Sequence, residues 1–376
     1  MTVYMDAAAT TPVLPEVAEL VIRLMVEDFG NAGSRTHEFG ARAKRAVNNA
    51  RAQVAAVVDA EPEGVLFTSG ATESNNLALL GLAPFGREEH RLHIVSTAIE
   101  HKAVLGPLER LATEGFEVDL VRPDASGQVS AGAVLERVRE DTLAVSMMAV
   151  NNETGVVQPV PAVAEGLKGA SAYLHVDAAQ AFGKELEALR HPRIDMLSVS
   201  GHKVFAPKGV GALVLRRRGY RRVPLTPLMV GGGQERGLRP GTVAVPLVAG
   251  LGLAADLALR EHAGRDKSCR SLREQLLAAL QPLGATVHGR GAHCVPHILS
   301  FHLRQVDSEA LMVLWKDEVA VSNGSACTSA SYTPSHVLTA MGLSPAAIDG
   351  TVRMSWSHLT QAPDLRALSE RLTLTR

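Results

Sequence analysis

The chain contains little cysteine and few aromatic residues. Of its 376 residues, only three are cysteines, and Phe, Trp and Tyr together make up 4%. Three cysteines cannot build a disulfide framework and leave at least one thiol free, which favours a reducing, cytoplasmic location. With so few rings, the core has to consist mainly of Ala, Val and Leu.

Long apolar runs and an excess of one charge are missing as well. No apolar stretch reaches the ~20 residues of a membrane-spanning helix, and no basic segment followed by an apolar one suggests a signal peptide. The net charge is −1, and basic residues are spread along the chain, which argues against nucleic acid or a membrane surface as a direct partner. We expect a cytoplasmic globular enzyme.

What the sequence does contain, from about residue 16 to 255, is an alternation of short apolar runs with helical patterns such as 103–113 and 131–139. This alternation predicts an α/β fold in which helices cover both faces of a mainly parallel sheet. The expected strands are 65–68, 93–97, 117–121, 143–150, 173–176, 196–199 and 210–215.

A second unit is expected after a Gly- and Pro-rich crossing that runs from Gly231 to Gly241. A long Ala/Leu helix, 245–260, leads into a compact α+β pattern with strands at 298–303 and 352–356 and helices at 308–315 and 363–372. We predict a large domain over residues 15–255 and a small domain formed by residues 1–14 and 256–376.

Polar segments follow several expected strands, at the edge where parallel sheets bind ligands. After Thr68, small residues make a turn and a helix begins near Thr72, which would suit a phosphate group. A plain capped turn is the alternative.

Asp177 and Lys203 each stand at the end of a further strand. Asp177 could cap the next helix, or it could pair with the ring nitrogen of pyridoxal phosphate (PLP). Lys203, within Ser200-Gly201-His202-Lys203, could be a solvated surface lysine, but its place favours a Schiff-base lysine. Ser200 and His202 could bind the same phosphate as Thr72.

Together these segments resemble the NifS/IscS branch of the cysteine desulfurases, which are fold-type-I PLP enzymes related to class V aminotransferases. The resemblance extends from Tyr4–Thr11 to Arg353-Met354-Ser355 and so covers nearly the whole chain. It implies a seven-stranded, mainly parallel sheet in the large domain.

The resemblance also implies a role for each matching residue. Lys203 would bind the cofactor and move the substrate α-proton, and His101 would stack on the cofactor ring and take part in acid–base chemistry. Thr242 would come from the neighbouring subunit, which implies a homodimer. The other implied cofactor contacts are Asp177 at the ring nitrogen, Gln180 at the ring hydroxyl, and Ala71, Thr72, Ser200 and His202 at the phosphate. Asn151 and Arg353 would hold the carboxylate of L-cysteine.

Cys327 lies among small and polar residues, which predicts an exposed loop, although most free cysteines are buried. The resemblance implies that its thiolate attacks the sulfur of L-cysteine, leaving alanine and a persulfide. The long segment between Ser325 and Pro334 resembles the group with an extended catalytic loop. A sulfur-acceptor protein would then receive the sulfur, either an iron–sulfur scaffold or a tRNA-thiolation enzyme.

Several alternatives stay open at this stage. IscS-type enzymes continue past the position of Arg376 with a tail that docks the scaffold, so the identity of the acceptor is an open expectation. A selenocysteine lyase fits the same residues, whereas another C–S lyase or an aminotransferase would not need Cys327. A silent PLP-fold binding partner would lack Lys203, Asp177 or Cys327, and all three are present.

The two other cysteines carry weaker signals. Cys269 lies in a helical pattern, which indicates a structural role. Cys294 has four histidines nearby in the sequence, but their spacing fits no standard zinc signature, so no metal site is expected.

Overall fold

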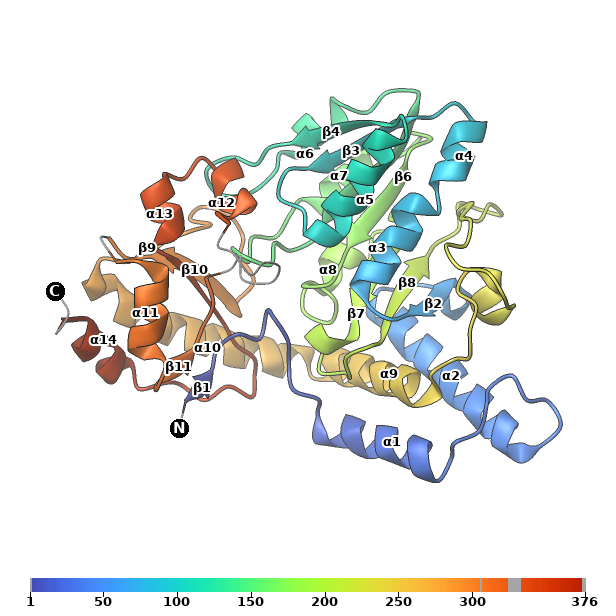
Figure 1. The fold of residues 1–376 in the computed structure, drawn as a ribbon, viewed down its shortest axis with the longest axis horizontal. Coiled ribbons are helices and arrows are strands. Elements are labelled where there is room, and N and C mark those ends of the chain that lie inside the picture. The colour runs from blue at the N-terminus through green and yellow to red at the C-terminus, as the bar shows by residue number, and fades with distance from the viewer. Residues whose placement is uncertain (1, 305, 324–332, 374–376) are drawn as a thin grey trace.

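The computed structural model describes residues 2–304, 306–323 and 333–373 (Figure 1). Cys327 therefore lies outside the described residues. Within them, no helix combines the length and the apolar character needed to cross a bilayer.

A seven-stranded sheet forms the larger part of the molecule, which confirms the predicted fold class. Its spatial order is β2-β8-β7-β6-β5-β3-β4, and only β8 runs antiparallel to its neighbours. The strands are β2 (Val65–Thr68), β3 (His93–Thr97), β4 (Glu117–Val121), β5 (Thr142–Met148), β6 (Tyr173–Asp177), β7 (Met196–Ser200) and β8 (Gly211–Leu215).

Helices cover both faces of this sheet because alternate strand residues point to opposite sides. Phe67 and Val214 belong to the core on the side of α1 (Pro15–Val26), α2 (Glu38–Val57) and α9 (Val245–Arg260). Leu66 and Leu213 belong to the core on the side of α3 (Ala71–Leu80), α4 (Ala83–Glu88) and α5 (Lys102–Thr113). Three shorter helices complete this part: α6 (Ala131–Leu135), α7 (Val160–Gly166) and α8 (Leu186–Leu189).

One predicted helix is shorter than expected. The pattern over 131–139 predicted a helix to Arg139, whereas α6 ends at Leu135. The backbone N–H of Arg139 donates to Thr142 Oγ1 at 2.8 Å, which closes a turn into β5.

The second part of the chain packs around a smaller antiparallel sheet, on the left of Figure 1. In it, β10 (Ile298–His302) lies between β9 (Thr286–Val287) and β12 (Thr351–Ser355). Beside it, β1 (Val3–Tyr4) pairs in parallel with β11 (Val319–Ala320). The N-terminal segment therefore joins the C-terminal part of the chain. The helices here are α10 (His262–Leu280), α11 (Ser308–Trp315), α12 (His336–Ala340), α13 (Pro345–Asp349) and α14 (Leu365–Thr373).

This second part has an apolar core of its own. Trp315 and Trp356 are almost fully buried in it, and Cys269 contributes from α10. Each indole N–H donates to a helix carbonyl, Trp315 to Leu368 and Trp356 to Cys269, both at 3.1 Å. Because these bonds satisfy the only polar atom of each ring, both rings can be buried without an unpaired donor.

Candidate active site

A cavity of about 600 Å³ opens where the carboxyl ends of the parallel strands meet the N-terminal segment and β12. Nine of the residues predicted for the site line it: Ala71, Thr72, His101, Asp177, Gln180, Ser200, His202, Lys203 and Arg353. They come from segments almost 300 residues apart in the sequence, so the fold brings together residues that the strand ends and the family resemblance had indicated separately.

Lys203 lies in a short 3₁₀ turn, Gly201–Lys203, directly after β7. Its ammonium donates to the carbonyl oxygens of Ala8 and Ala9, the latter at 2.6 Å. Because these carbonyls belong to the N-terminal segment, Lys203 ties that segment to the end of the large sheet.

Asp177 ends β6 and is buried at the floor of the cavity. One carboxylate oxygen accepts from the Asn75 amide at 2.8 Å, and the other accepts from the Ala179 N–H at 2.9 Å. Gln180 donates to the Ala8 carbonyl at 2.9 Å. Asn75 Oδ1 and Gln180 Oε1 are buried without a partner in the described structure, so two acceptors beside Asp177 are left for a ligand.

His101 caps the N-terminus of α5, where its Nδ1 accepts from the Ala103 N–H at 3.1 Å. Burial lowers its pKa, and the charges of Lys203 and His336 act in the same direction, whereas Asp177 opposes them. The ring is therefore neutral near pH 7. Because Nδ1 accepts, the ring proton is on Nε2.

The turn between β2 and α3 is shaped for an anion. Helix α3 has no side-chain cap, so the N–H groups of its first turn are left for a ligand. Gly70 also lies so close to Gly211 that a Cβ on Gly211 would be 2.5 Å from the Gly70 Cα. Ser200 lines the same wall, and His202 Nδ1 lies 3.2 Å from Thr10 Oγ1.

Arg353 crosses from β12 to the cavity and is only 2% exposed. Its guanidinium donates to Asp6 at 2.6 Å and to the Asn152 carbonyl at 2.9 Å. The remaining Nε is buried without a partner in the described structure. Arg353 is thus a buried cation rather than part of a surface ion pair.

Two predicted residues are placed differently. Asn151 is fully buried but does not line the cavity, because its oxygen accepts from Glu153 N and Thr154 N and its amide donates to Ile99 O. Thr242 is exposed and is not part of the cavity in the single chain. The roles of all the predicted site residues, including these two and Cys327, stay predictions.

The residues present fit PLP. The lining holds three cationic side chains, Lys203, Lys208 and Arg353, and one carboxylate, Asp177. Such a balance suits a phosphate and a substrate carboxylate together. Asp177 ends β6, whereas the uncapped helix α3 begins after β2, so the carboxylate and the anion-binding turn are supplied by different strand ends.

Several residues of the site were not predicted from the sequence. Asn75 follows the phosphate turn, but nothing local indicates that it reaches Asp177 more than 100 residues away. Asp6 belongs to one of the motifs of the resemblance, yet its pairing with Arg353 was not expected. The only available signal was that Asn75 and Asp6 lie within segments that carry the family resemblance.

A second group of buried residues joins α12 to the site. Ser335 donates to Glu153 at 2.5 Å, and His336 Nε2 lies 2.8 Å from the carbonyl of Glu100. Burial raises the pKa of Glu153 and raises that of Glu100 to about 8. These contacts fix the chain eight residues after Cys327 against the loop that carries His101.

The expectation that basic residues are dispersed is wrong at one place. The hairpin after β8, closed by a bridge between Arg218 and Arg221, gathers arginines around two cavities of about 340 and 280 Å³. The sequence places Arg216, Arg217, Arg218, Arg221 and Arg222 together, and counting net charge over the whole chain hid this cluster. None of these arginines lines the 600 Å³ cavity.

The fold and the lining residues agree with those of the class V aminotransferase family. Residues 3–368 match the family described as aminotransferase class-V, so the chain belongs to this family of PLP-dependent enzymes.

Within that class, the relatives are more specific. The chain is 43% identical to the cysteine desulfurase IscS of Methylococcus capsulatus, over 97% of this chain and 90% of that protein. It is 54% identical to the solved structure of DndA from Streptomyces lividans, over 94% and 99% of the two chains, with a TM-score of 0.83. It is 36% identical to SspA, solved in complex with cysteine, over 94% and 98%, with a TM-score of 0.82. The chain therefore belongs to the cysteine desulfurase family that includes IscS.

Proposed function

We propose that this protein is a PLP-dependent cysteine desulfurase that moves sulfur from L-cysteine to Cys327 and releases L-alanine. The observation that carries the proposal is the cavity in which Lys203, Asp177, His101 and Arg353 converge. Family membership supports it, and a relative that binds cysteine supports the substrate.

Lys203 would hold the cofactor, with Asp177 at its ring nitrogen and the first turn of α3 at its phosphate. When bound, PLP supplies an electron sink for the bonds at the substrate α-carbon. The Asn75 amide keeps the Asp177 carboxylate oriented, because it occupies one of the carboxylate oxygens at 2.8 Å. A carboxylate held in this way stabilises a protonated ring nitrogen.

Arg353 lines the cavity and would bind the carboxylate of L-cysteine. Two of its nitrogens are fixed by Asp6 and by the Asn152 carbonyl, so the guanidinium is oriented before the substrate arrives. The neutral His101 ring, with its proton on Nε2, can donate a proton to a group in the cavity and take it back. The Nζ of Lys203, when it is a free amine, would accept the substrate α-proton.

Cys327 would accept the sulfur. A thiolate is the reactive form of cysteine, and the cationic lining of the cavity favours an anionic thiolate there. The persulfide would then pass to an acceptor protein, and Thr242 would complete the phosphate site of the other subunit in a homodimer. The acceptor would belong to iron–sulfur cluster assembly or to another sulfur-transfer system.

The test is the production of alanine and sulfide from L-cysteine, with a reducing thiol present, by the wild type and by Cys327→Ala. We expect equal amounts of both products from the wild type and neither from the variant, while the yellow absorption of the bound cofactor stays. Cys294→Ala is the matched control and should keep activity. Activity in Cys327→Ala, or pyruvate in place of alanine, would assign the protein to the lyases.

A further inference from the structure

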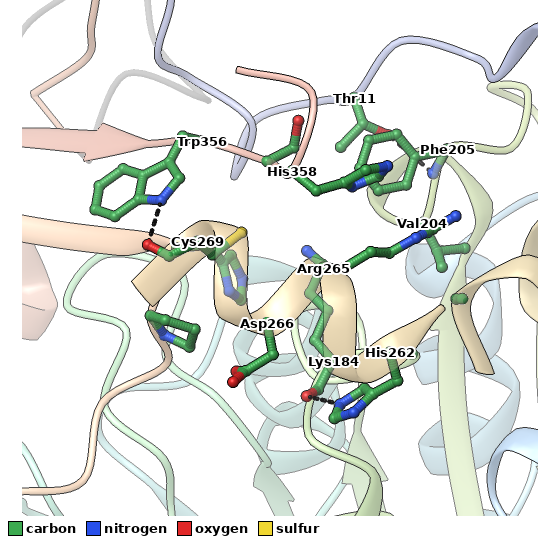
Figure 2. Close-up of a pocket in the computed structure, with 15 residues that line it drawn as sticks. Thr11, Lys184, Val204, Phe205, His262, Arg265, Asp266, Cys269, Trp356 and His358 are labelled. Carbon is green, nitrogen blue, oxygen red and sulfur yellow. Dashed lines mark hydrogen bonds between the residues drawn. The ribbon is translucent and has the colours of Figure 1, made fainter. Parts of the chain in front are cut away.

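A second cavity lies between the two parts of the molecule, behind the wall that carries Lys203. Figure 2 shows Lys184, Arg265, Asp266 and Cys269 gathered on one side of it, with Trp356 and His358 on the other. The walls come from the N-terminal segment through Thr11 and from the large part through Gly183, Lys184, Val204 and Phe205. The second part contributes α10, Pro296-His297 and Trp356–His358.

The charges around this cavity leave one cation uncompensated. Arg265 is paired with Glu261 at 2.9 Å, and Asp266 is paired with Arg270 at 2.6 Å. Lys184, which is half-buried, has neither a hydrogen-bond partner nor an ion-pair partner for its Nζ among the residues that the structure describes. A cation that is partly withdrawn from water and has no partner is stabilised by a nearby negative charge, so an anion would be favoured beside it.

Two histidines of the cavity, His297 and His358, have lowered pKa values. Burial holds the pKa of His297 well below its usual value and lowers that of His358 to about 4. His297 is 5% exposed, and its Nε2 is buried without a partner in the described structure. An unpaired nitrogen of a neutral imidazole can donate to an oxygen when it carries the ring proton.

The size of the cavity limits what can bind. Its volume is about 50 Å³, and one water needs roughly 10–15 Å³ by the same measure. The space therefore suits about three to five non-hydrogen atoms. Val204, Phe205 and Trp356 add apolar contacts, which favour a small organic anion over a strongly hydrated inorganic one.

We propose that this pocket is a binding site for a small carboxylate monoanion, of the size of formate or acetate, held between Lys184 and His297. A single negative charge matches the single uncompensated cation. The two carboxylate oxygens match two lining residues, Lys184 from the large part and His297 from the second part.

The position of the pocket couples it to the active site. Val204 and Phe205 directly follow Lys203 in the chain. The Thr11 hydroxyl accepts from the Phe205 N–H at 2.9 Å and donates to the His202 carbonyl at 3.1 Å. The charge of Lys203 also contributes to a pKa of about 8 for Lys184, after the larger effect of burial. An anion at Lys184 would thus offset positive charge next to Lys203.

Binding can be measured on the cofactor-free protein, so the result does not depend on the proposed activity. Sodium acetate is titrated by calorimetry at constant ionic strength against sodium chloride, with benzoate as an anion too large for the cavity. We expect saturable binding of acetate and formate but not of benzoate. Lys184→Met keeps the aliphatic stem and should weaken acetate binding at least about tenfold, since a charge-assisted hydrogen bond is lost.

The matched control is Lys168→Met, which removes a lysine that is exposed and paired with Glu165 and should leave acetate binding unchanged. Lys184→Arg keeps the charge and should retain binding. No saturable acetate binding to the wild type, or equal binding to Lys184→Met, would overturn the proposal. If Lys184→Met does not fold, a wild type that binds no acetate, or equal binding of benzoate, still overturns it.

The coupling to the active site has its own readout and rests on the proposed function. With cofactor bound, acetate should raise the pH at which the absorption of the lysine-bound cofactor changes, because an added negative charge stabilises the protonated form. Lys184→Met, which removes a nearby positive charge, should raise it too and should abolish the acetate response. Acetate binding without any such shift in the wild type would leave the pocket as a ligand site and remove its coupling to Lys203.

Discussion

Replacing Arg353 by lysine tests the most specific part of the site. The substitution keeps the positive charge but replaces a planar group with several donors by a single ammonium. In the structure, the three nitrogens of Arg353 take different positions: one donates to Asp6 at 2.6 Å, one donates to the Asn152 carbonyl at 2.9 Å, and Nε has no partner among the described residues. One ammonium cannot reach all three positions.

The expected magnitude follows from the contact that the substrate loses. A hydrogen bond to a charged group contributes about 1.5–3 kcal/mol, and each 1.4 kcal/mol is about tenfold in affinity. The KM for L-cysteine should therefore rise about 10- to 100-fold in Arg353→Lys, with a smaller change in kcat. The lost contact to Asp6 or Asn152 should also lower the free energy of unfolding by about 1–3 kcal/mol.

The assay is alanine formation as a function of L-cysteine concentration, together with denaturant unfolding. Arg193→Lys is the matched control, because Arg193 is also mostly buried and binds Asp195 and a backbone carbonyl, but it does not line the cavity. It should lose stability without a change in KM. An unchanged KM in Arg353→Lys, or an equal rise in the control, would refute the assignment of Arg353 to the substrate carboxylate.

Three further predictions concern buried ionisable groups. Glu235 binds Arg51 at 2.7 Å in a buried ion pair. Glu235→Ala should therefore lower the free energy of unfolding by about 3–5 kcal/mol, and an unchanged midpoint of urea unfolding would contradict this. Burial raises the pKa of Glu100 to about 8. Between about pH 4.5 and pH 8 the folded state therefore holds a proton that the unfolded chain has released. The contribution of Glu100 to the free energy of unfolding falls as the pH rises through this range. Glu100→Gln should therefore gain stability relative to the wild type between about pH 5 and pH 8, and a constant difference in denaturant unfolding would show that Glu100 is ionised in the fold. Burial raises the pKa of Cys269 to about 11, so iodoacetamide at about pH 8 should label Cys327 in the native protein and leave Cys269 unlabelled, as peptide mass spectrometry would report.

The fold class and most of the candidate site follow from the amino-acid sequence. Expected strands such as 65–68 and 93–97 match β2 and β3 residue for residue, because buried strands are short apolar runs bounded by turn residues. The strand pattern also places Asp177 and Lys203 at one edge of the sheet, because parallel strands end at the same edge. The assignment of roles needed the family resemblance, since no single motif was specific.

Which distant groups share a hydrogen bond depends on the tertiary structure. Asn75 reaches Asp177, Asp6 reaches Arg353, and the side-chain oxygen of Asn151 accepts from backbone groups of its own loop while its amide reaches Ile99. The uncompensated charge of Lys184 is equally invisible in the sequence, where a lysine after a glycine looks solvated. Local patterns fix the helices and strands because backbone preference and apolar periodicity act over a few residues. Partners at long sequence separation depend on packing between elements, which no local pattern records.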